Sequence, residues 1–187
     1  LALRKRNYLC KYIGLDSCEK FVSYAQNKFS SDDLCRFELI DLEEPIKLDV
    51  KGDFVINAFN LFELSDIQQP IKNAYDLLSQ NGHFLISTID STYLILAVSS
   101  SWSEFLHNLD LYQNISGIKY AFQPIDLGDK ASKTLEYPSV LYSREDYITA
   151  AKNVGFQIAS YKEHVFTSKP IPKIYFHIDF VKGGTCV

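Results

Sequence analysis

The 187-residue sequence contains no methionine, and none stands at position 1, where translation would place one. A chain of this size normally carries several, so we expect the sequence to be a segment of a longer protein. It also has no apolar run near the ~20 residues that a membrane-spanning helix needs, and no signal peptide opens it. We therefore expect a cytoplasmic protein without a membrane partner.

The sequence also lacks a strong net charge of one sign and the cysteine and histidine spacings that are typical of metal sites. The 19 basic and 23 acidic side chains give a formal net charge of −4, which provides no electrostatic case for a nucleic-acid partner. The four cysteines include no C-x-x-C pair and the four histidines no H-x-x-x-H pair, so no metal site is expected. With 47% apolar and 22% charged residues, the composition is typical of one globular domain.

Strand-like and helix-like segments alternate along most of the chain. The expected strands are 11–15, 35–40, 53–58, 83–88, 156–166 and 174–181, and the expected helices are 19–29, 67–78 and 144–154. Alternating elements with short apolar strands predict an α/β fold with an open, mostly parallel sheet. The short connector before the final strand predicts an antiparallel hairpin, because a parallel pair would need a longer crossover.

Local signals predict where two of these helices begin or end. Asn81-Gly82 is expected to end the helix 67–78 as a C-cap turn. Ser143 is expected to be the N-cap of the helix 144–154, with Asp146 completing a capping box, and Gly155 is expected to end that helix.

Polar residues follow several of the expected strands, where ligands bind in open parallel sheets. A carboxylate such as Asp16, after the first strand, can accept hydrogen bonds from both ribose hydroxyls of a nucleotide. Asp41, after the second strand, can accept one from the exocyclic amine of adenine. The segment 57–60 (N-A-F-N) follows the third strand and Asp90 the fourth. Together these residues indicate a nucleoside-shaped site, although each by itself is equally typical of a cap or a turn.

At these segments the sequence resembles the class I S-adenosylmethionine-dependent methyltransferases, especially those acting on small molecules. The resembling segments, in the order of the family, are 12–26 (Y-I-G-L-D-S-C-E-K-F-V-S-Y-A-Q), 37–42 (F-E-L-I-D-L), 54–66 (F-V-I-N-A-F-N-L-F-E-L-S-D), 77–86 (L-L-S-Q-N-G-H-F-L-I) and 142–156 (Y-S-R-E-D-Y-I-T-A-A-K-N-V-G-F). The resemblance implies a Rossmann-like sheet with an antiparallel last strand, S-adenosylmethionine as cofactor, and methyl transfer to a small organic acceptor. Such enzymes act mainly by positioning, because the cofactor already carries an activated methyl group.

The resemblance also implies the site residues within a single methyltransferase domain of residues 1–187. The expected cofactor-binding residues are Asp16, Ser17, Asp41, Leu42, Asn57, Ala58, Phe59 and Phe62. The segment of about 91–142 is expected to form a lid over the acceptor, and the expected acceptor-binding residues are Asp90, Tyr93, Trp102 and Tyr142. The alternative for Trp102 is that it only packs a helix onto the sheet. No catalytic residue is assigned and no metal is expected.

The family's Gly-rich loop is missing. No G-x-G occurs among the eight glycines, and only 15 residues precede Asp16, although such a loop lies ~20 residues before the acid. We expect an upstream segment outside this sequence, or a partner chain such as a second copy, to supply the loop and its strand. Two alternatives stay open: a non-catalytic scaffold or interaction domain of the same fold, and an NAD-dependent Rossmann oxidoreductase, in which Asp16 would also suit a ribose.

Overall fold

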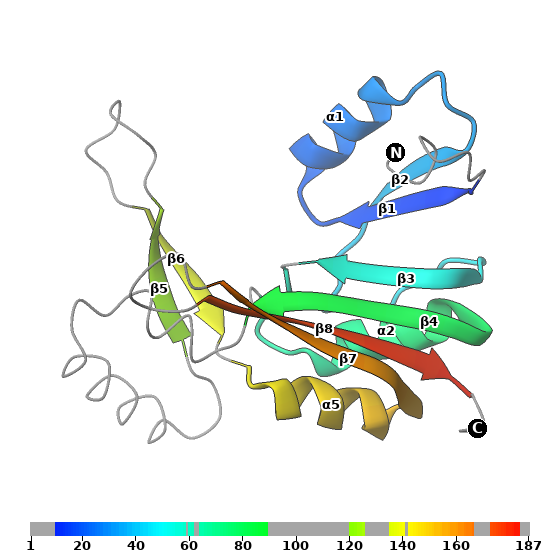
Figure 1. Ribbon diagram of the computed structural model, residues 1–187. Coiled ribbons are helices and arrows are strands. Elements are labelled where there is room, and N and C mark those ends of the chain that lie inside the picture. Colours follow the sequence, from blue (N-terminus) through cyan, green and yellow to red (C-terminus); the bar gives the residue numbers. More distant parts are fainter. Residues whose placement is uncertain are drawn as a thin grey trace. The chain divides into compact units, whose positions relative to one another are not determined.

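The computed structural model describes residues 10–58, 60–61, 64–89, 120–125, 135–140, 142–166 and 173–183. The chain divides into two compact units, Leu1–Lys47 and Leu48–Val187. Each unit is described by itself (Figure 1). No described helix reaches the length and apolar character of a membrane span.

The first unit is a βαβ arrangement of β1 (Tyr12–Asp16), α1 (Glu19–Lys28) and β2 (Cys35–Leu39). β1 and β2 pair in parallel, as their connection through a helix predicts. The Phe37 ring of β2 lies 5.6 Å from the ring of Phe29 and 5.8 Å from that of Tyr12, measured between centroids. Gly14 of β1 lies beneath this ring, because a Cβ there would come within 2.7 Å of the Phe37 Cδ1. Three aromatic rings and one glycine thus set the packing of this small unit.

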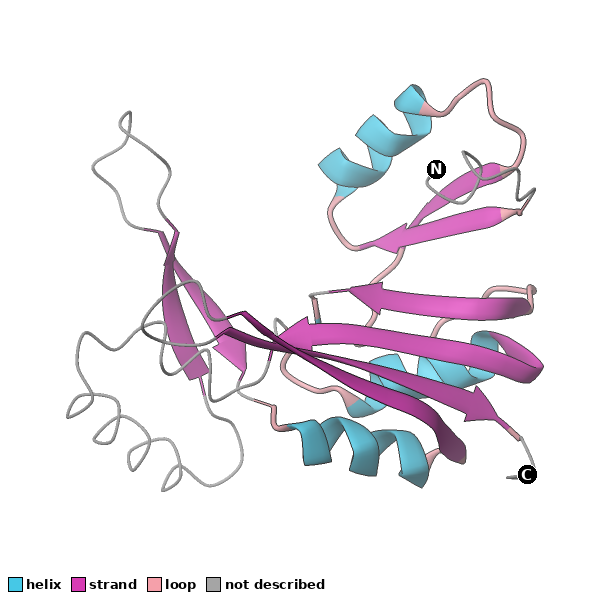
Figure 2. Cartoon of the chain, in the orientation of Figure 1, coloured by secondary structure: helices cyan, strands magenta, loops and turns pink. Residues whose placement is uncertain are grey.

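The second unit contains a four-stranded sheet in the order β3-β4-β8-β7. Its elements are β3 (Gly52–Ala58), α2 (Gln68–Leu77), β4 (Leu78–Ile89), α5 (Arg144–Asn153), β7 (Phe156–Phe166) and β8 (Lys173–Lys182). α2 and α5 cover the same face of this sheet (Figure 1 and Figure 2). The core between them is apolar and includes Ile71, Tyr147, Phe84, Phe176 and Phe180. A further pair, β5 (Tyr120–Ile125) and β6 (Leu135–Val140), is antiparallel and lies in the segment expected to form the lid.

The strand pairing confirms the predicted α/β fold and its antiparallel last strand. β3 and β4 pair in parallel, whereas β8 is antiparallel to both of its neighbours, β4 and β7. The sheet of the second unit is therefore mixed, and the parallel pairs of the described residues are β1 with β2 and β3 with β4. The predicted antiparallel hairpin of the last two strands is confirmed, and β7 pairs with β8 from Phe156 opposite Lys182 to Phe166 opposite Lys173.

The prediction that Asn81-Gly82 caps α2 is wrong. α2 ends at Leu77, and Leu78 already has the extended backbone of β4, with φ −84° and ψ 142°. Leu78 pairs with Gly52, and the pairing resumes only at His83 opposite Phe54, so Asn81, with φ 62°, lies in an irregularity of the strand. Sheet pairing thus begins before the expected turn.

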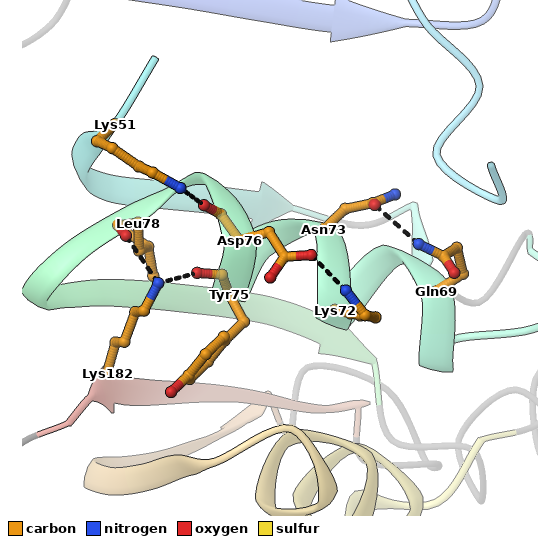
Figure 3. A network of polar contacts seen from close by, with 8 residues as sticks. All are labelled: Lys51, Gln69, Lys72, Asn73, Tyr75, Asp76, Leu78 and Lys182. Carbon is orange, nitrogen blue, oxygen red and sulfur yellow. Dashed lines mark hydrogen bonds and ion pairs between the residues drawn. The ribbon is translucent and has the colours of Figure 1, made fainter. Parts of the chain in front are cut away.

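Lysines from outside the helix satisfy the carbonyl groups at the C-terminus of α2. Lys182 Nζ donates hydrogen bonds to the carbonyl oxygens of Tyr75 (2.6 Å) and Leu78 (3.0 Å), and Lys51 Nζ donates one to that of Asp76 (Figure 3). Cations at this end also interact favourably with the helix dipole. Because these donors come from β8 and from the residue before β3, no glycine cap is needed there.

The predicted capping of α5 is confirmed. Ser143 Oγ accepts a hydrogen bond from the Asp146 backbone N–H at 3.2 Å, and the Ser143 N–H donates to Asp146 Oδ2 at 2.6 Å. Past the helix end, Gly155 has φ +103°, a conformation that favours glycine, and β7 begins at the next residue. These local signals position α5 beneath the sheet, where Tyr147 enters the core.

Candidate functional site

In the first unit, the two predicted carboxylates lie at the same edge of the β1–β2 pair. Asp16 is the last residue of β1, and Asp41 lies two residues after the end of β2. The Ile40 N–H donates to the Asp16 carbonyl oxygen at 2.9 Å, which continues the strand pairing up to this edge. The carboxyl ends of adjacent parallel strands therefore bring Asp16 and Asp41 together, as the sequence predicts.

Both aspartates are turn residues, and each has one carboxylate oxygen without a hydrogen bond to a described residue. Asp16 Oδ1 accepts a hydrogen bond from the Cys18 N–H at 2.7 Å, and Asp41 Oδ1 accepts one from the Glu43 N–H at 2.9 Å. Both side chains are exposed, and within the described residues Oδ2 of each has no hydrogen bond. The turn explanation and the binding explanation are thus compatible, because one oxygen stabilises the turn while the other can accept a hydrogen bond from a ligand.

The neighbours of these aspartates were also predicted to bind the cofactor. Ser17 is exposed and follows Asp16 directly, before α1 begins. Leu42 is half-buried and follows Asp41. Each lies beside its aspartate at the carboxyl edge of the first unit, and the contact of each with a ligand stays a prediction.

In the second unit, polar atoms near the carboxyl ends of β3 and β4 have no hydrogen-bond partner among the described residues. Asn57 Oδ1 in β3 and Asn60 Oδ1 just beyond it are buried, and neither has a hydrogen-bond partner among the residues that the structure describes. The hydroxyls of Thr88, near the end of β4, and Tyr147, on α5, are also buried. Neither makes a hydrogen bond of regular geometry with a described residue, although the two hydroxyls lie close enough to interact. Ala58, also predicted to bind the cofactor, is exposed and pairs with Ser87 of β4. Polar groups buried without partners are rare in native proteins, so these four atoms call for an explanation.

Of these four residues, only Asn57 was predicted to bind the cofactor. The sequence places Asn60, at the end of the N-A-F-N segment, and Thr88, directly before Ile89-Asp90, at strand ends, but neither was assigned a binding role. No sequence signal marks Tyr147 as a site residue, because an aromatic residue on an amphipathic helix is typical of the hydrophobic core. The structure shows that Tyr147 is fully buried. Burial raises the pKa of the Tyr147 hydroxyl above its usual range, and the neighbouring Thr88 hydroxyl opposes that rise.

Tyr142, which was predicted to contact the acceptor, connects the start of α5 with the segment after β3. Its hydroxyl lies 2.8 Å from the carbonyl oxygen of Ser65 and 3.2 Å from that of Leu64, and it donates to them. Its ring centroid lies 5.8 Å from that of Tyr147. Tyr142 thus helps to position the chain that follows β3, and its contact with an acceptor stays a prediction.

The other predicted site residues lie outside the described residues. These are Phe59, Phe62, Asp90, Tyr93 and Trp102, together with most of the expected lid at 91–142. Among the residues that are described, no group of three or more His, Cys, Asp or Glu side chains is arranged to bind a metal ion.

Residues 1–86 match the family described as "Methyltransferase domain". The chain is similar in structure to an S-adenosylmethionine-dependent methyltransferase from Mesorhizobium loti, with a TM-score of 0.65, 17% identity, and coverage of 97% of this chain and 84% of that one. It is also similar to an S-adenosylmethionine-dependent methyltransferase from Clostridium acetobutylicum ATCC 824, with a TM-score of 0.64, 15% identity, and coverage of 92% and 75%. A third similar structure is the glycopeptide N-methyltransferase MtfA in complex with S-adenosylmethionine, with a TM-score of 0.60, 11% identity, and coverage of 96% and 80%. No curated protein matches the sequence.

Proposed function

We propose that this chain is a class I S-adenosylmethionine-dependent methyltransferase, with S-adenosylmethionine as its cofactor, and that it methylates a small organic acceptor. The family match of residues 1–86 and the likeness of fold to methyltransferases support the proposal. The observation that carries the proposal is the pair of exposed carboxylates, Asp16 and Asp41, at the carboxyl edge of the β1–β2 pair. The antiparallel β7–β8 hairpin favours this function over NAD-dependent oxidation, because the strands of dinucleotide-binding sheets are mostly parallel.

The residues of the first unit fit a nucleoside. The Oδ2 atom of Asp16 can accept a hydrogen bond from a ribose hydroxyl, and that of Asp41 can accept one from the adenine amine. Ser17 offers a hydroxyl beside the ribose-binding acid, and Leu42 offers an apolar surface for the adenine ring. Asn57, Ala58, Phe59 and Phe62 are the residues proposed for the methionine part of the cofactor.

When bound, the cofactor supplies a methyl group on a positively charged sulfur. The chain's own residues then have to bind the cofactor and the acceptor, orient them toward each other, and exclude water. These are the contributions that accelerate such a transfer. Asp90, Tyr93, Trp102 and Tyr142 are the residues proposed to bind the acceptor, with the segment of about 91–142 as the lid. A lid of this kind excludes water and sets specificity by its shape.

Two features support a small acceptor. The net charge of −4 does not favour a nucleic acid. The segment 57–60 reads N-A-F-N, which lacks the Pro-Pro-aromatic sequence that the amino-methylating DNA enzymes carry after the corresponding strand. Among the similar structures, the MtfA protein is a glycopeptide N-methyltransferase.

Calorimetric titration with S-adenosylhomocysteine tests the proposal. We expect the wild type to bind, and Asp16→Ala and Asp41→Ala each to lose about 1–3 kcal/mol of binding free energy, because each removes a charged acceptor. Asp33→Ala is the matched control: Asp33 is an exposed aspartate of the same unit, away from the carboxyl edge, and its loss should leave the affinity unchanged. If Asp16→Ala and Asp41→Ala bind S-adenosylhomocysteine as tightly as the wild type does, these two carboxylates are not part of the cofactor site.

The acceptor class needs a second assay. The protein is incubated with S-adenosylmethionine carrying a labelled methyl group and with a cell extract separated by size. We expect label in the fraction below ~1 kDa, the range of ordinary small ligands. Label found only in protein or nucleic acid would contradict a small acceptor, and binding of S-adenosylhomocysteine without any transfer would favour the scaffold alternative.

A further inference from the structure

The connection between β3 and α2 has two buried anchors and a more exposed stretch between them. Leu61 and Ile67 both belong to the hydrophobic core of the second unit. Between them, Leu64 is half-buried, whereas Ser65 and Asp66 are exposed. A local turn fixes part of this stretch, because the Leu64 N–H donates to the Leu61 carbonyl oxygen at 3.3 Å. Burial therefore holds the two anchors more firmly than the residues between them.

A tyrosine from a distant part of the chain bonds to this stretch. The Tyr142 hydroxyl donates to the carbonyl oxygen of Ser65 at 2.8 Å and to that of Leu64 at 3.2 Å, 77 and 78 residues away in the sequence. A phenol has one hydrogen, so the two carbonyl groups share it in a three-centre hydrogen bond. One hydroxyl thus restrains two successive peptide groups of the connection.

The donor itself is held in place. The Tyr142 N–H donates to the Val140 carbonyl oxygen at 3.1 Å, and the next residue, Ser143, is the N-cap of α5 with its capping box. The Tyr142 ring lies edge-on to the ring of Tyr147, with centroids 5.8 Å apart, and Tyr147 is fully buried. Because both its backbone and its ring are fixed, Tyr142 presents its hydroxyl at a defined point, and the connection is positioned against it.

The same connection carries residues that are proposed to bind the cofactor. Asn57 and Ala58 end β3, Phe59 and Phe62 follow, and all four are proposed for the methionine part of the cofactor. Segments that follow the carboxyl ends of parallel strands form the ligand site in open α/β sheets. Binding residues have to be held within about 0.5 Å of their productive positions by groups around them. The hydrogen bonds from Tyr142 begin two residues after the last of these four, so they bear on that placement.

We propose that Tyr142 is a positioning residue for methyl transfer. Its hydroxyl holds the connection between β3 and α2 in the place where that connection binds the methionine part of the cofactor, and it does so without touching the cofactor. The inference rests on the proposed function and adds a role for the hydroxyl to the acceptor contact proposed for the same residue. The two roles can be separated, because a phenylalanine keeps the ring and loses only the hydroxyl.

Two tyrosine variants form a matched pair for the test. Tyr142→Phe removes the hydroxyl that bonds to the connection. Tyr161→Phe is the control, because the Tyr161 hydroxyl also donates a hydrogen bond, to Glu163 within β7. Urea unfolding measures the stability of both variants. A general loss of stability would weaken the binding of every ligand alike, whereas a positioning role changes the affinity for one ligand relative to another.

Amide hydrogen exchange, measured by nuclear magnetic resonance without any ligand, tests whether the hydroxyl holds the connection. The Leu64 N–H is the reporter, because it is hydrogen-bonded within the connection. We expect this amide to exchange about two- to tenfold faster in Tyr142→Phe, since the loss of one hydrogen bond favours local opening. Tyr161→Phe should leave its exchange rate unchanged.

Calorimetric titration with two nucleosides tests the link to the cofactor. S-adenosylhomocysteine carries the amino-acid end of the cofactor, and 5′-methylthioadenosine lacks it. We expect Tyr142→Phe to bind S-adenosylhomocysteine about two- to tenfold more weakly than the wild type does, and to bind 5′-methylthioadenosine with the wild-type affinity. Tyr161→Phe should bind both nucleosides as the wild type does.

Three results would overturn the inference. An unchanged exchange rate of the Leu64 amide in Tyr142→Phe would show that the hydroxyl does not hold the connection. Wild-type affinity of Tyr142→Phe for both nucleosides would leave this residue with an acceptor contact at most. An equal loss of affinity for both nucleosides would show a purely structural role. These results differ from a failure of the proposed function, in which the wild type itself would bind neither nucleoside.

Discussion

The ammonium group of Lys182 lies 2.6 Å from the carbonyl oxygen of Tyr75 and 4.4 Å from the centroid of the same residue's ring (Figure 3). One side chain of the last strand thus binds both the backbone at the end of α2 and an aromatic face above it. The contact spans 107 residues of sequence and ties the C-terminal strand to the helix before β4.

Replacing this lysine should destabilise the second unit. Lys182→Met removes two hydrogen bonds from a charged donor, and we expect a loss of about 1.5–3 kcal/mol in the free energy of unfolding, measured in urea. Lys72→Met is the control, because Lys72 forms an exposed pair with Asp76 at 2.5 Å on the same helix and should contribute much less. Equal losses for the two variants would show that the cap contributes no more than a surface ion pair.

Removing the Tyr147 hydroxyl should be neutral or stabilising. The side chain is fully buried and its hydroxyl has no partner of regular hydrogen-bond geometry among the described residues, so Tyr147→Phe removes an unpaired polar group and keeps the ring in place. We expect a gain of up to about 1 kcal/mol in the free energy of unfolding. A loss of that size would show that the hydroxyl is bonded, and the double variant with Thr88→Val would show whether Thr88 is the partner.

Gly155 should tolerate no side chain. Its φ of +103° is strained for other residues, and an added Cβ would come within 3.2 Å of the Tyr75 hydroxyl. We expect Gly155→Ala to destabilise the protein by about 1–3 kcal/mol in chemical denaturation. Gly52→Ala is the comparison, since an added Cβ there meets no atom closer than 3.4 Å. If Gly52→Ala proved the more damaging of the two, the backbone argument would be wrong.

The β7–β8 hairpin should weaken as the pH falls. Burial lowers the pKa of His177, and the adjacent His164 and Lys162 lower it further, with the two imidazole centroids 4.9 Å apart. The unfolded chain therefore binds a proton at His177 near pH ~6.5, while the folded chain binds it only at lower pH. The free energy of unfolding should therefore have its full value above about pH 6.5 and decline as the pH falls from there toward the lowered pKa of His177 in the folded chain.

Urea unfolding between pH 8 and pH 5 measures this dependence. His177→Phe should flatten the pH profile, and Lys162→Gln should flatten it less, since it removes only one of the positive neighbours. A profile that His177→Phe leaves unchanged would assign the acid sensitivity to other groups.

Local signals in the sequence determined much of the fold. The strand at 156–166, the capping box of Ser143 and Asp146, the turn at Gly155 and the antiparallel final hairpin are all predicted and confirmed. Each depends on residues close together in the chain, where hydrophobic period, capping chemistry and connector length act without distant partners. The edge that joins Asp16 and Asp41 was likewise predictable, because parallel strands align their carboxyl ends.

Tertiary structure decided where α2 ends and which polar groups lack partners. Asn81-Gly82 is a sound local stop signal, yet Leu78 pairs with Gly52 first, and Lys182 supplies the cap from 104 residues away. Likewise, Asn57 Oδ1 is buried and has no hydrogen-bond partner among the residues that the structure describes, and no local sequence signal predicts this. The sequence by itself determines which conformations each segment prefers, whereas burial and hydrogen-bond satisfaction depend on segments far apart in the chain, and these two decide the chemistry available at the strand ends.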